Sequence, residues 1–400
     1  MRILITDGAE RAALATARSL VAAGHQVHVA AASRFALAAV TRGVRAVPVR
    51  ADALRDPDRY AAEIASLVEA LEATLLLPVT DASVSALLQH RATLPAAVAL
   101  PLPSLAAYRL ASDKAAILPY AREAGLALPE SVVLESPMSG DRLRHCLPGP
   151  DFFPAVVKPH ASIVGGATAR QKAGVAQVAD LDACHAVVAA LPREAFPVLV
   201  QRRVHGPGEG LFLLRWDGRV LATFAHRRLR EKPPAGGVSV YRESIDRDPD
   251  LVAAGTKLLD LLDWQGVAMI ECKRDTATGR HVLIEVNGRL WGSLQLAIDA
   301  GVDFPRLLAD CARGLDLAPV TEYRVGVRSR WLWGDLDHLY LRLSRSAQSL
   351  QLDGGAARSR IAALRSFFRR APQGEREEIW RWRDPAPFLV ETLSRLGVLH

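Results

Sequence analysis

The amino-acid sequence predicts an α/β protein in three parts: a parallel sheet covered by helices, an α+β region, and a mainly helical end. Over the first hundred residues, short apolar strands alternate with helical stretches. From there to about residue 320, hairpin turns join apolar strands, and beyond residue 320 amphipathic helices predominate. Alternation of strand and helix is typical of a parallel sheet, whereas hairpins are typical of an antiparallel one.

The first part begins with a strand, and a helical pattern then covers residues 9–23 and ends at Gly24. The turn between them, residues 6–10, lacks the spaced glycines of a dinucleotide-binding loop. Dinucleotide binding therefore has little support, although the fold can still be Rossmann-like. The expected strands are residues 2–6, 26–31, 46–49, 74–79 and 97–100.

The second part combines helices with hairpins. Two helices are expected over residues 104–124, and they meet at Ser112, Asp113 and Lys114, where serine or aspartate can cap a helix. Turn residues at 216–219 predict one hairpin, and those at 276–279 predict another. Further helices are expected at residues 181–191, 249–262 and 299–315, and strands at 155–158, 168–172, 198–201, 209–215 and 220–226.

The last part has a different residue pattern, and one strand is expected in it, over residues 325–333. Helices are expected over residues 336–349, 357–368 and 384–396. We therefore expect domain boundaries at 1–103, 104–320 and 321–400, with a hinge near residues 201–209 inside the second domain.

Composition excludes several classes of protein. Half of the residues are hydrophobic and the charge content is ordinary, which indicates a globular chain. No apolar run reaches the length of a membrane span, and the start of the chain has the pattern of a strand rather than a signal peptide. The four cysteines are far apart, which argues against a zinc site or a disulfide framework and favours a reducing cytoplasm.

The basic residues do not indicate a nucleic-acid partner. The net charge is +7, but the chain has only six lysines, so 44 of its 50 basic residues are arginines. They are spread along the sequence without a basic block interleaved with aromatic residues. Because arginine is the default cation here, a lysine at the end of a strand is a stronger sign of chemistry than usual.

Two glutamates, Glu271 and Glu285, each end an apolar strand in the middle of the chain. Strand side chains alternate between faces, so Glu285, Asn287 and Arg289 should project from the same face. Adjacent carboxylates repel each other unless a cation lies between them. Two carboxylates and an amide oxygen suit Mg²⁺, and an arginine beside them suits a phosphate or carboxylate. The alternative is a solvated sheet face, which the continuously apolar flanks disfavour.

Residues upstream of these strands suit a polyphosphate. Lys158 ends a strand, and the small-residue loop after it contains Gly165 and Gly166. Backbone amides freed by glycine can wrap phosphate oxygens, and a lysine at the strand end can reach them. Lys114 is a second candidate for binding phosphate. Each signal has a plain structural alternative, either a solvated strand end or an ordinary turn.

The strand that ends at Gln201 has the pattern of a hinge between two lobes. An adenine could bond to the main chain around Arg202 and Val204, and Glu209 could accept a hydrogen bond from ribose hydroxyls. The alternative for Glu209 is an ordinary exposed acid in a turn.

In this order, these residues resemble the ATP-grasp superfamily over about residues 104–314, and the first hundred residues resemble the Rossmann-like domain that precedes it. Within the superfamily, the chain looks most like a carboxylate–amine ligase-like group that includes D-aspartate ligases. That narrower resemblance rests on residues 227–237, 285–293, 331–335 and 384–387.

The resemblance implies a set of roles, with ATP and Mg²⁺ as cofactors and Mn²⁺ as an alternative metal. The phosphate-binding residues would be Lys114 and Lys158. The residues around adenine and ribose would be Gln201, Arg202, Val204 and Glu209. The metal ligands would be Glu271, Glu285 and Asn287, with Glu285 bridging two ions. Gln201 departs from the pattern, since many relatives have glutamate there.

The resemblance also suggests which residues meet the substrate. Arg289 would hold the substrate carboxylate and its acyl phosphate. The basic stretch that contains Arg228, Arg230 and Lys232 lies between the hinge and the acidic strands, and we expect one of these to meet the acyl phosphate or the acid substrate. The alternative for this stretch is a solvated basic turn.

The expected activity is an ATP-dependent carboxylate–amine ligase, which makes an acyl phosphate, transfers it to an amine, and releases ADP and phosphate. Its partners would be small-molecule carboxylates and amines, with neither nucleic acid nor membrane, and dimers are common in the family. One alternative is an ATP-grasp carboxylase that acts through carboxyphosphate. Another is a non-catalytic ATP-binding regulatory protein, against which the intact Glu271, Glu285, Asn287 and Arg289 count.

Overall fold

The computed structural model describes residues 1–165, 170–350, 352, 359–369 and 374–399. Its N-terminal part is a four-stranded parallel sheet in the order β3-β2-β1-β4. The predicted strand at 97–100 reduces to a single bridge from Ala99 to Leu75. The strands are β1 (Arg2–Ile5), β2 (Gln26–Ala31), β3 (Val44–Pro48) and β4 (Leu75–Leu77), and the helices are α1 (Arg11–Ala22), α2 (Pro57–Ala70) and α3 (Asp81–Gln89).

Helices cover both faces of this parallel sheet, as the alternating pattern predicts. On β1, Ile3 and Ile5 pack with the residues of α1, whereas Leu4 packs with those of α2 and α3. Successive strand residues point to opposite faces, so an all-apolar strand such as this one is buried on both sides.

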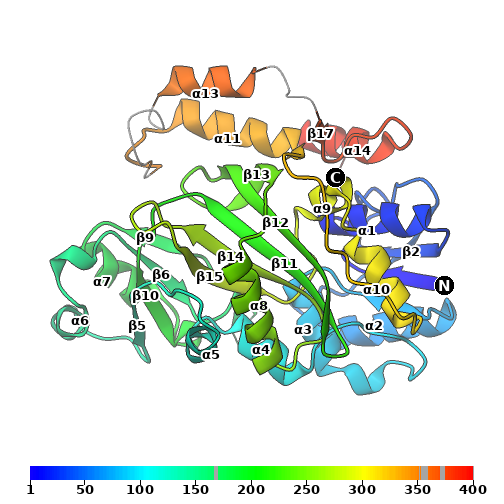
Figure 1. The fold of residues 1–400 in the computed structure, drawn as a ribbon, viewed down its shortest axis with the longest axis horizontal. Coiled ribbons are helices and arrows are strands. Elements are labelled where there is room, and N and C mark those ends of the chain that lie inside the picture. The colour runs from blue at the N-terminus through cyan, green and yellow to red at the C-terminus, as the bar shows by residue number, and fades with distance from the viewer. Residues whose placement is uncertain (166–169, 351, 353–358, 370–373, 400) are drawn as a thin grey trace.

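A second sheet, in the order β5-β10-β6-β9, forms the lobe on the left of Figure 1. It has its own apolar core, to which α7 contributes Cys184 and Val188. The two helices expected over residues 104–124 precede it and are separated at Asp113 and Lys114. These elements are α4 (Leu105–Ser112), α5 (Ile117–Glu123), β5 (Ser131–Leu134), α6 (Gly140–Cys146), β6 (Ala155–Pro159), β7 (Ile163–Val164), β8 (Gln171–Lys172), β9 (Ala176–Val178), α7 (Leu181–Ala190) and β10 (Val198–Arg202).

A seven-stranded sheet, in the order β15-β14-β11-β12-β13-β16-β17, occupies the centre of the molecule (Figure 1). Both predicted hairpins are antiparallel pairs in it. One face packs against α8 with α4 and α5, and the other packs against α1 with α9 and α10. The elements are β11 (Gly208–Trp216), β12 (Arg219–Lys232), β13 (Val238–Ser244), α8 (Pro249–Leu261), β14 (Gly266–Arg274) and β15 (His281–Asn287).

The helix expected over residues 299–315 is two helices, α9 (Leu294–Ala300) and α10 (Phe304–Ala312), so that prediction was wrong in detail. Gly301, with φ of 117°, ends α9 in the left-handed conformation that favours glycine. The Asp303 side chain then caps α10 by accepting a hydrogen bond from the Arg306 amide. A glycine stop and an aspartate cap two residues apart thus divide one apolar stretch.

The C-terminal part is mainly helical, as predicted, and lies along the top of Figure 1. It also adds two strands to the edge of the large sheet, and the second of them was not predicted. Within the described ranges, no helix is both long enough and apolar enough to cross a membrane. The elements are β16 (Arg328–Arg330), α11 (Leu332–Ser344), α13 (Arg360–Phe367), β17 (Glu375–Glu377) and α14 (Ala386–Arg395).

Candidate active site

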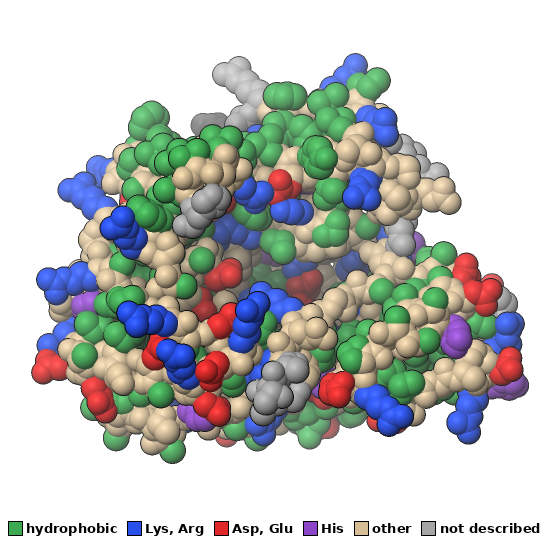
Figure 2. All heavy atoms as spheres, turned by 180° about the vertical axis from the view of Figure 1, so that it is seen from behind, with side chains coloured by type: hydrophobic (Ala, Val, Ile, Leu, Met, Phe, Trp, Pro, Cys, Tyr) green, Lys and Arg blue, Asp and Glu red, His purple; other side chains and the backbone are tan. Residues whose placement is uncertain are grey.

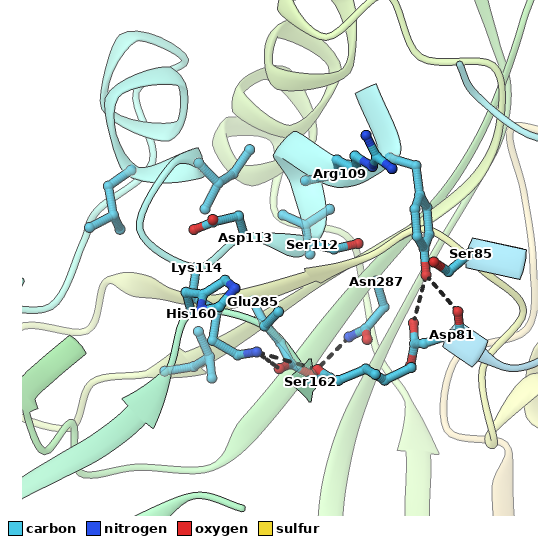
Figure 3. A pocket seen from close by; sticks show the side chains of 18 of the residues that line it. Asp81, Ser85, Arg109, Ser112, Asp113, Lys114, His160, Ser162, Glu285 and Asn287 are labelled. Carbon is cyan, nitrogen blue, oxygen red and sulfur yellow. Dashed lines mark hydrogen bonds and ion pairs between the residues drawn. The ribbon is translucent and has the colours of Figure 1, made fainter. Parts of the chain in front are cut away.

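Two connected cavities lie where the parts of the fold meet. The main cavity, of about 450 Å³, lies between the β5-β10-β6-β9 sheet and the seven-stranded sheet. The side cavity, of about 410 Å³, is bordered by α3, α4 and β15 (Figure 3). Figure 2 shows the molecule hollowed at its centre, with acidic and basic side chains inside the hollow. The residues that line both cavities are Lys114, Gln201, Ile284, Glu285 and Asn287.

The two predicted metal-binding glutamates are neighbours. Glu271 on β14 pairs in register with Glu285 on β15, and Asn287 lies two pairs further along, on the same face. The Asn287 amide donates to the Glu285 carboxylate over 2.9 Å. Among the described residues, no group of three or more His, Cys, Asp or Glu side chains could hold a metal, so the candidate ligands are two carboxylates and an amide.

Each of these carboxylates faces a side-chain cation. Lys114 Nζ lies 4.0 Å from Glu285 Oε2, and Arg228 Nη2 lies 2.5 Å from Glu271 Oε2. Burial opposes ionisation of Glu285, but Lys114, Asn287 and Lys158 outweigh it, so the pKa of this carboxyl is lowered. For Glu271, burial and the neighbouring Glu285 prevail over Arg228, and the pKa is raised.

Lys158 faces the acidic pair from β6, across the main cavity. The residue is 7% exposed, and burial lowers the pKa of its ammonium to about 8, against the opposing effect of Glu285. Lys114 comes from the start of the turn between α4 and α5, and it donates to the Ser162 hydroxyl over 3.3 Å. The two predicted phosphate lysines therefore lie around one cavity with the acidic pair.

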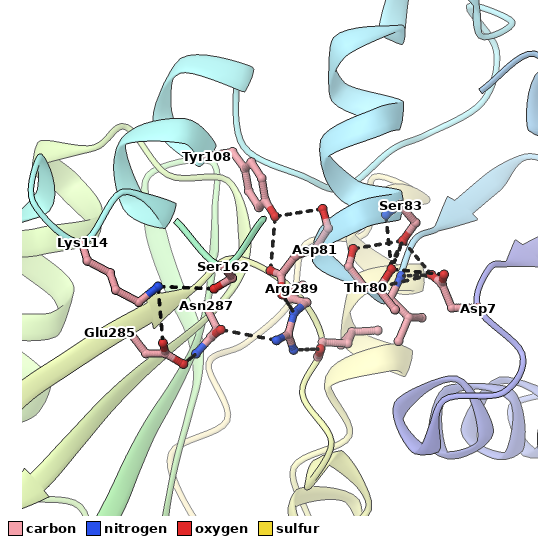
Figure 4. Close-up of polar contacts among 12 residues, drawn as sticks. Asp7, Thr80, Asp81, Ser83, Tyr108, Lys114, Ser162, Glu285, Asn287 and Arg289 are labelled. Carbon is pink, nitrogen blue, oxygen red and sulfur yellow. Dashed lines mark hydrogen bonds and ion pairs between the residues drawn. The ribbon is translucent and has the colours of Figure 1, made fainter. Parts of the chain in front are cut away.

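Arg289 forms an ion pair that the sequence did not predict. Its Nε lies 2.8 Å from the carboxylate of Asp81, the first residue of α3, and its Nη2 donates to Asn287 (Figure 4). The Tyr108 hydroxyl also donates to Asp81. Burial would lower the pKa of the Arg289 guanidinium, but Asp81 outweighs it and the pKa is raised. In the sequence, Asp81 follows the end of an expected strand, and that position was the signal by which it could have been found.

The start of α3 is fixed by a buried polar network. Asp7, at the end of β1, accepts hydrogen bonds from the Thr80 amide and hydroxyl and from the Ser83 hydroxyl. Thr80 in turn caps α3, with Ser83 completing a capping box. The turn at residues 6–10 thus positions Asp81 beside Arg289, and a chain of contacts joins β1 to the acidic strands (Figure 4).

Three basic residues, Arg228, Arg230 and Lys232, were the candidates to meet substrate. Arg230 pairs with Asp335 of α11 and lines neither cavity. Of the three, only Arg228 lines the main cavity. It lies between Glu271 and Glu231, at 2.5 and 3.0 Å. Lys232 instead pairs with Asp337 of α11 and lines neither cavity, so the structure contradicts the role predicted for it. Irregularities in the β12–β13 pairing between Arg228 and Glu231 interrupt the alternation and turn Lys232 toward the C-terminal helices.

The structure also places Glu209 away from both cavities, which contradicts its predicted contact with ribose. On β11, Gly208 and Gly210 face the main cavity side, and Gly210 pairs with Glu271. Glu209 therefore points to the opposite face, where Arg227 and His281 each lie 2.8 Å from its carboxylate. Burial opposes its ionisation, but the bonds from His281 and Arg227 lower the pKa.

The predicted hinge lines the main cavity through Gln201, Arg202 and Val204. The Gln201 amide donates to the Ser131 hydroxyl over 2.9 Å, and the Val204 carbonyl accepts from Lys273. Lys273 had no predicted role, although it is two residues past Glu271 and so shares its face. Gly165 has a φ of 110° after β7 and lines neither cavity, and Gly166 lies outside the described residues.

Comparison with known proteins identifies the fold. Residues 195–334 match a family described as ATP-grasp in the biosynthetic pathway with Ter operon. The chain has the ATP-grasp fold. N5-carboxyaminoimidazole synthetase from Staphylococcus aureus is similar over 82% of this chain and 80% of its own, with 13% identity and a TM-score of 0.60. No curated protein matches the chain in sequence.

Two further solved structures share the ATP-grasp fold. Biotin carboxylase from Campylobacter jejuni is similar over 82% of this chain and 74% of its own, with 16% identity and a TM-score of 0.59. L-amino acid ligase from Bacillus licheniformis is similar over 78% and 73%, with 17% identity and a TM-score of 0.57. The resemblance to the ATP-grasp superfamily is thereby confirmed at the level of the fold.

Proposed function

We propose that the protein is an ATP-dependent carboxylate–amine ligase that works with Mg²⁺. One observation carries the proposal: Glu271, Glu285 and Asn287 share one sheet face, Lys158 faces them across the main cavity, and Arg289 continues the row. A metal-bound polyphosphate and a substrate carboxylate need this combination of acids, amide and cations.

The residues present fit Mg²⁺. Carboxylate and amide oxygens are its preferred protein ligands, and here two carboxylates and one amide converge. Side-chain cations now neutralise the two carboxylates, which indicates that the site favours positive charge between them. When bound, Mg²⁺ would neutralise phosphate charge and help to align the γ-phosphate for in-line transfer.

The remaining roles belong to the chain itself. Lys114 and Lys158 would hold the phosphates, and the hinge at Arg202 and Val204 would hold the adenine. Arg289 would orient the substrate carboxylate, so that its oxygen attacks the γ-phosphorus while the bond to ADP breaks. An amine nitrogen then attacks the acyl carbon, phosphate leaves, and the nitrogen loses a proton. Holding both reactants at one site lowers the entropic part of the barrier.

The similarity of the fold to an L-amino acid ligase supports ligation, and that to N5-carboxyaminoimidazole synthetase and biotin carboxylase supports carboxylation as the runner-up. A panel of carboxylates is incubated with Mg²⁺-ATP and hydroxylamine, which traps an acyl phosphate as a hydroxamate. Hydroxamate with ADP release is the expected result. ADP release that requires bicarbonate alone would favour the carboxylase, and ATP binding without turnover on the whole panel would contradict the ligase.

A further inference from the structure

Part of the main cavity is walled by buried polar side chains without hydrogen-bond partners among the described residues. His226 is 1% exposed, Trp291 2% and Ser239 7%, and all three line the cavity. Both ring nitrogens of His226, the hydroxyl of Ser239 and Nε1 of Trp291 are unpartnered. Burying a polar group without a partner is costly, so groups of this kind around one cavity indicate a ligand that pairs with them.

These side chains come from separate elements that line one cavity: His226 and Trp291 lie together, and Ser239 on β13 pairs with Glu231 further along the same wall. His226 on β12 is in register with Gly210, which is in register with Glu271, so the histidine and the acidic pair share one row of the sheet. The Phe212 ring contacts both aromatic groups, with centroids 4.8 Å from His226 and 4.3 Å from Trp291. We call His226, Ser239 and Trp291 the distal subsite.

Glycine at position 210 keeps this row open. A Cβ there would lie 3.2 Å from His226 Nε2 and 2.9 Å from the Phe212 ring. Any larger side chain would therefore push on the histidine or fill the space between it and Glu271. The close approach gives a physical reason for a glycine in the interior of β11, where glycine otherwise weakens a strand.

The free atoms of the distal subsite are mostly donors. The Trp291 indole can only donate, whereas His226 and Ser239 can each donate and accept. Arg228 Nε, which is also unpartnered and lines the same cavity, can only donate. A ligand that satisfies the Trp291 indole and Arg228 Nε must therefore present acceptor oxygens.

Charge around the distal subsite disfavours a cationic ligand. Arg228 and Arg242 lie close enough to His226 to help burial keep its pKa well below the ordinary value, so the ring is neutral. Arg11 also borders the cavity. The nearby carboxylate of Glu378 is already shared by Arg11 and Arg242. Glu231, which is opposite Ser239, is likewise paired with Arg228. An ammonium group would therefore face these guanidiniums beside carboxylates that already have cationic partners.

We propose that the distal subsite binds the far end of the amine substrate, and that this end carries a carboxylate or amide oxygen rather than a second ammonium. The inference rests on the proposed function, because it needs an acyl phosphate for the amine to attack. It adds a substrate class: primary amines with an oxygen acceptor several bonds from the nitrogen. His226 is in the row of Glu271 and Glu285 but two strands away from Glu271, so this end lies in the same cavity as the reacting groups and several bonds from them.

The test compares primary amines of matched length with different ends: 4-aminobutyrate, 4-aminobutanamide, pentylamine and 1,4-diaminobutane. Each is supplied with Mg²⁺-ATP and the carboxylate that gives a hydroxamate, and kcat/KM for ADP release is measured. We expect the two oxygen-ended amines to exceed the other two by about tenfold or more, as a site built to pair with an oxygen rejects ligands that lack one. Equal rates, or a preference for the diamine, would overturn the proposal.

Two conservative variants test whether the distal subsite causes the preference for oxygen-ended amines. Ser239→Ala and Trp291→Phe each remove one hydrogen-bonding group, and we expect either to reduce the preference for oxygen-ended amines by about fivefold. Trp382→Phe, at a residue that is 87% exposed, is the matched control. Thermal melts check that each variant folds.

Hydroxylamine is too small to reach the distal subsite, so hydroxamate formation should be unchanged in both variants. A parallel loss of hydroxamate would overturn the proposal, because these residues would then serve ATP or the acyl phosphate. An unchanged preference for oxygen-ended amines would also overturn the proposal, and water would then be the occupant of the distal subsite. Absence of hydroxamate in the unmodified protein would instead refute the proposed ligase, so the two failures are distinguishable.

Discussion

Glu271 and Glu285 have neighbouring positions but opposite electrostatic surroundings. Glu285 has Lys114, Asn287 and Lys158 around it, and its pKa is lowered despite burial. Glu271 is buried beside the charge of Glu285, and its pKa is raised although Arg228 contacts it. Glu285 is therefore the better anchor for a cation, since it is the carboxylate that the surroundings keep charged.

Replacing Glu285 should consequently abolish turnover. We expect Glu285→Gln to lower kcat by at least about 100-fold, because several kcal/mol of charge stabilisation at the phosphates would be lost. Mg²⁺-dependent ATP binding, measured by calorimetry, should weaken in parallel. Glu243→Gln is the control, since Glu243 is on the same sheet but lines neither the main nor the side cavity. A variant with normal Mg²⁺-ATP binding would refute the metal role of Glu285.

Strand alternation explains which site residues could be predicted. The sequence places Glu285, Asn287 and Arg289 two residues apart, and all three lie around the main cavity. Alternation does not extend to Lys232, since irregular pairing in β12 shifts the register there, and a shift by one residue reverses the face. Asp81 was missed because its partner Arg289 is 208 residues away, and no local pattern records such a contact.

At the scale of elements, apolar patterning predicted most strands and helices, but it missed β13 and β17 and did not show where elements end. The failed helix at 299–315 had the apolar spacing of a helix, yet Gly301 and Asp303 divide it. For Glu209, the pairing of Gly210 with Glu271 decides which face the side chain joins. The helix division depends on an element boundary, where sequence patterns are weakest, and the face of Glu209 depends on a pairing between distant strands.

The contact between α11 and α14 includes a carboxyl group with an unusual pKa. Glu391 on α14 accepts a hydrogen bond from the indole of Trp331, the residue before α11, over 2.7 Å. Its other oxygen is buried and has no partner among the described residues. Burial raises the pKa of Glu391 to about 7, with Glu377 adding to the effect.

This raised pKa makes the stability depend on pH. The folded state holds the proton of Glu391 more tightly than the unfolded state does, so the free energy of unfolding falls as pH rises from about 4.5 to about 7. We expect Glu391→Gln to raise the unfolding free energy at pH 8 by about 1–3 kcal/mol and to change it little at pH 4. Urea denaturation at both pH values measures this. Glu322→Gln, at an exposed position, should show neither effect.

At the scale of the whole molecule, the C-terminal part ties the first helix to the central sheet. Arg18 of α1 lies 2.8 Å from Asp384 and donates to the Ile379 carbonyl. Arg11, also on α1, lies 2.6 Å from Glu378, which pairs as well with the fully buried Arg242 of β13. The C-terminal segment thus contacts Arg11, which borders the main cavity.

Glu378 is the carboxylate that pairs with both the buried Arg242 and the partly buried Arg11, so its removal should destabilise the whole fold. Breaking a buried ion pair leaves an uncompensated charge, and we expect Glu378→Gln to lower the unfolding free energy by about 3–5 kcal/mol. Glu375→Gln on β17 is the control, with a loss of about 1 kcal/mol or less, since Glu375 accepts only from the Tyr241 hydroxyl among its described hydrogen bonds. Urea denaturation followed by circular dichroism measures both. A similar loss in the two variants would show that α1 and β13 do not depend on the Glu378 carboxylate for their attachment.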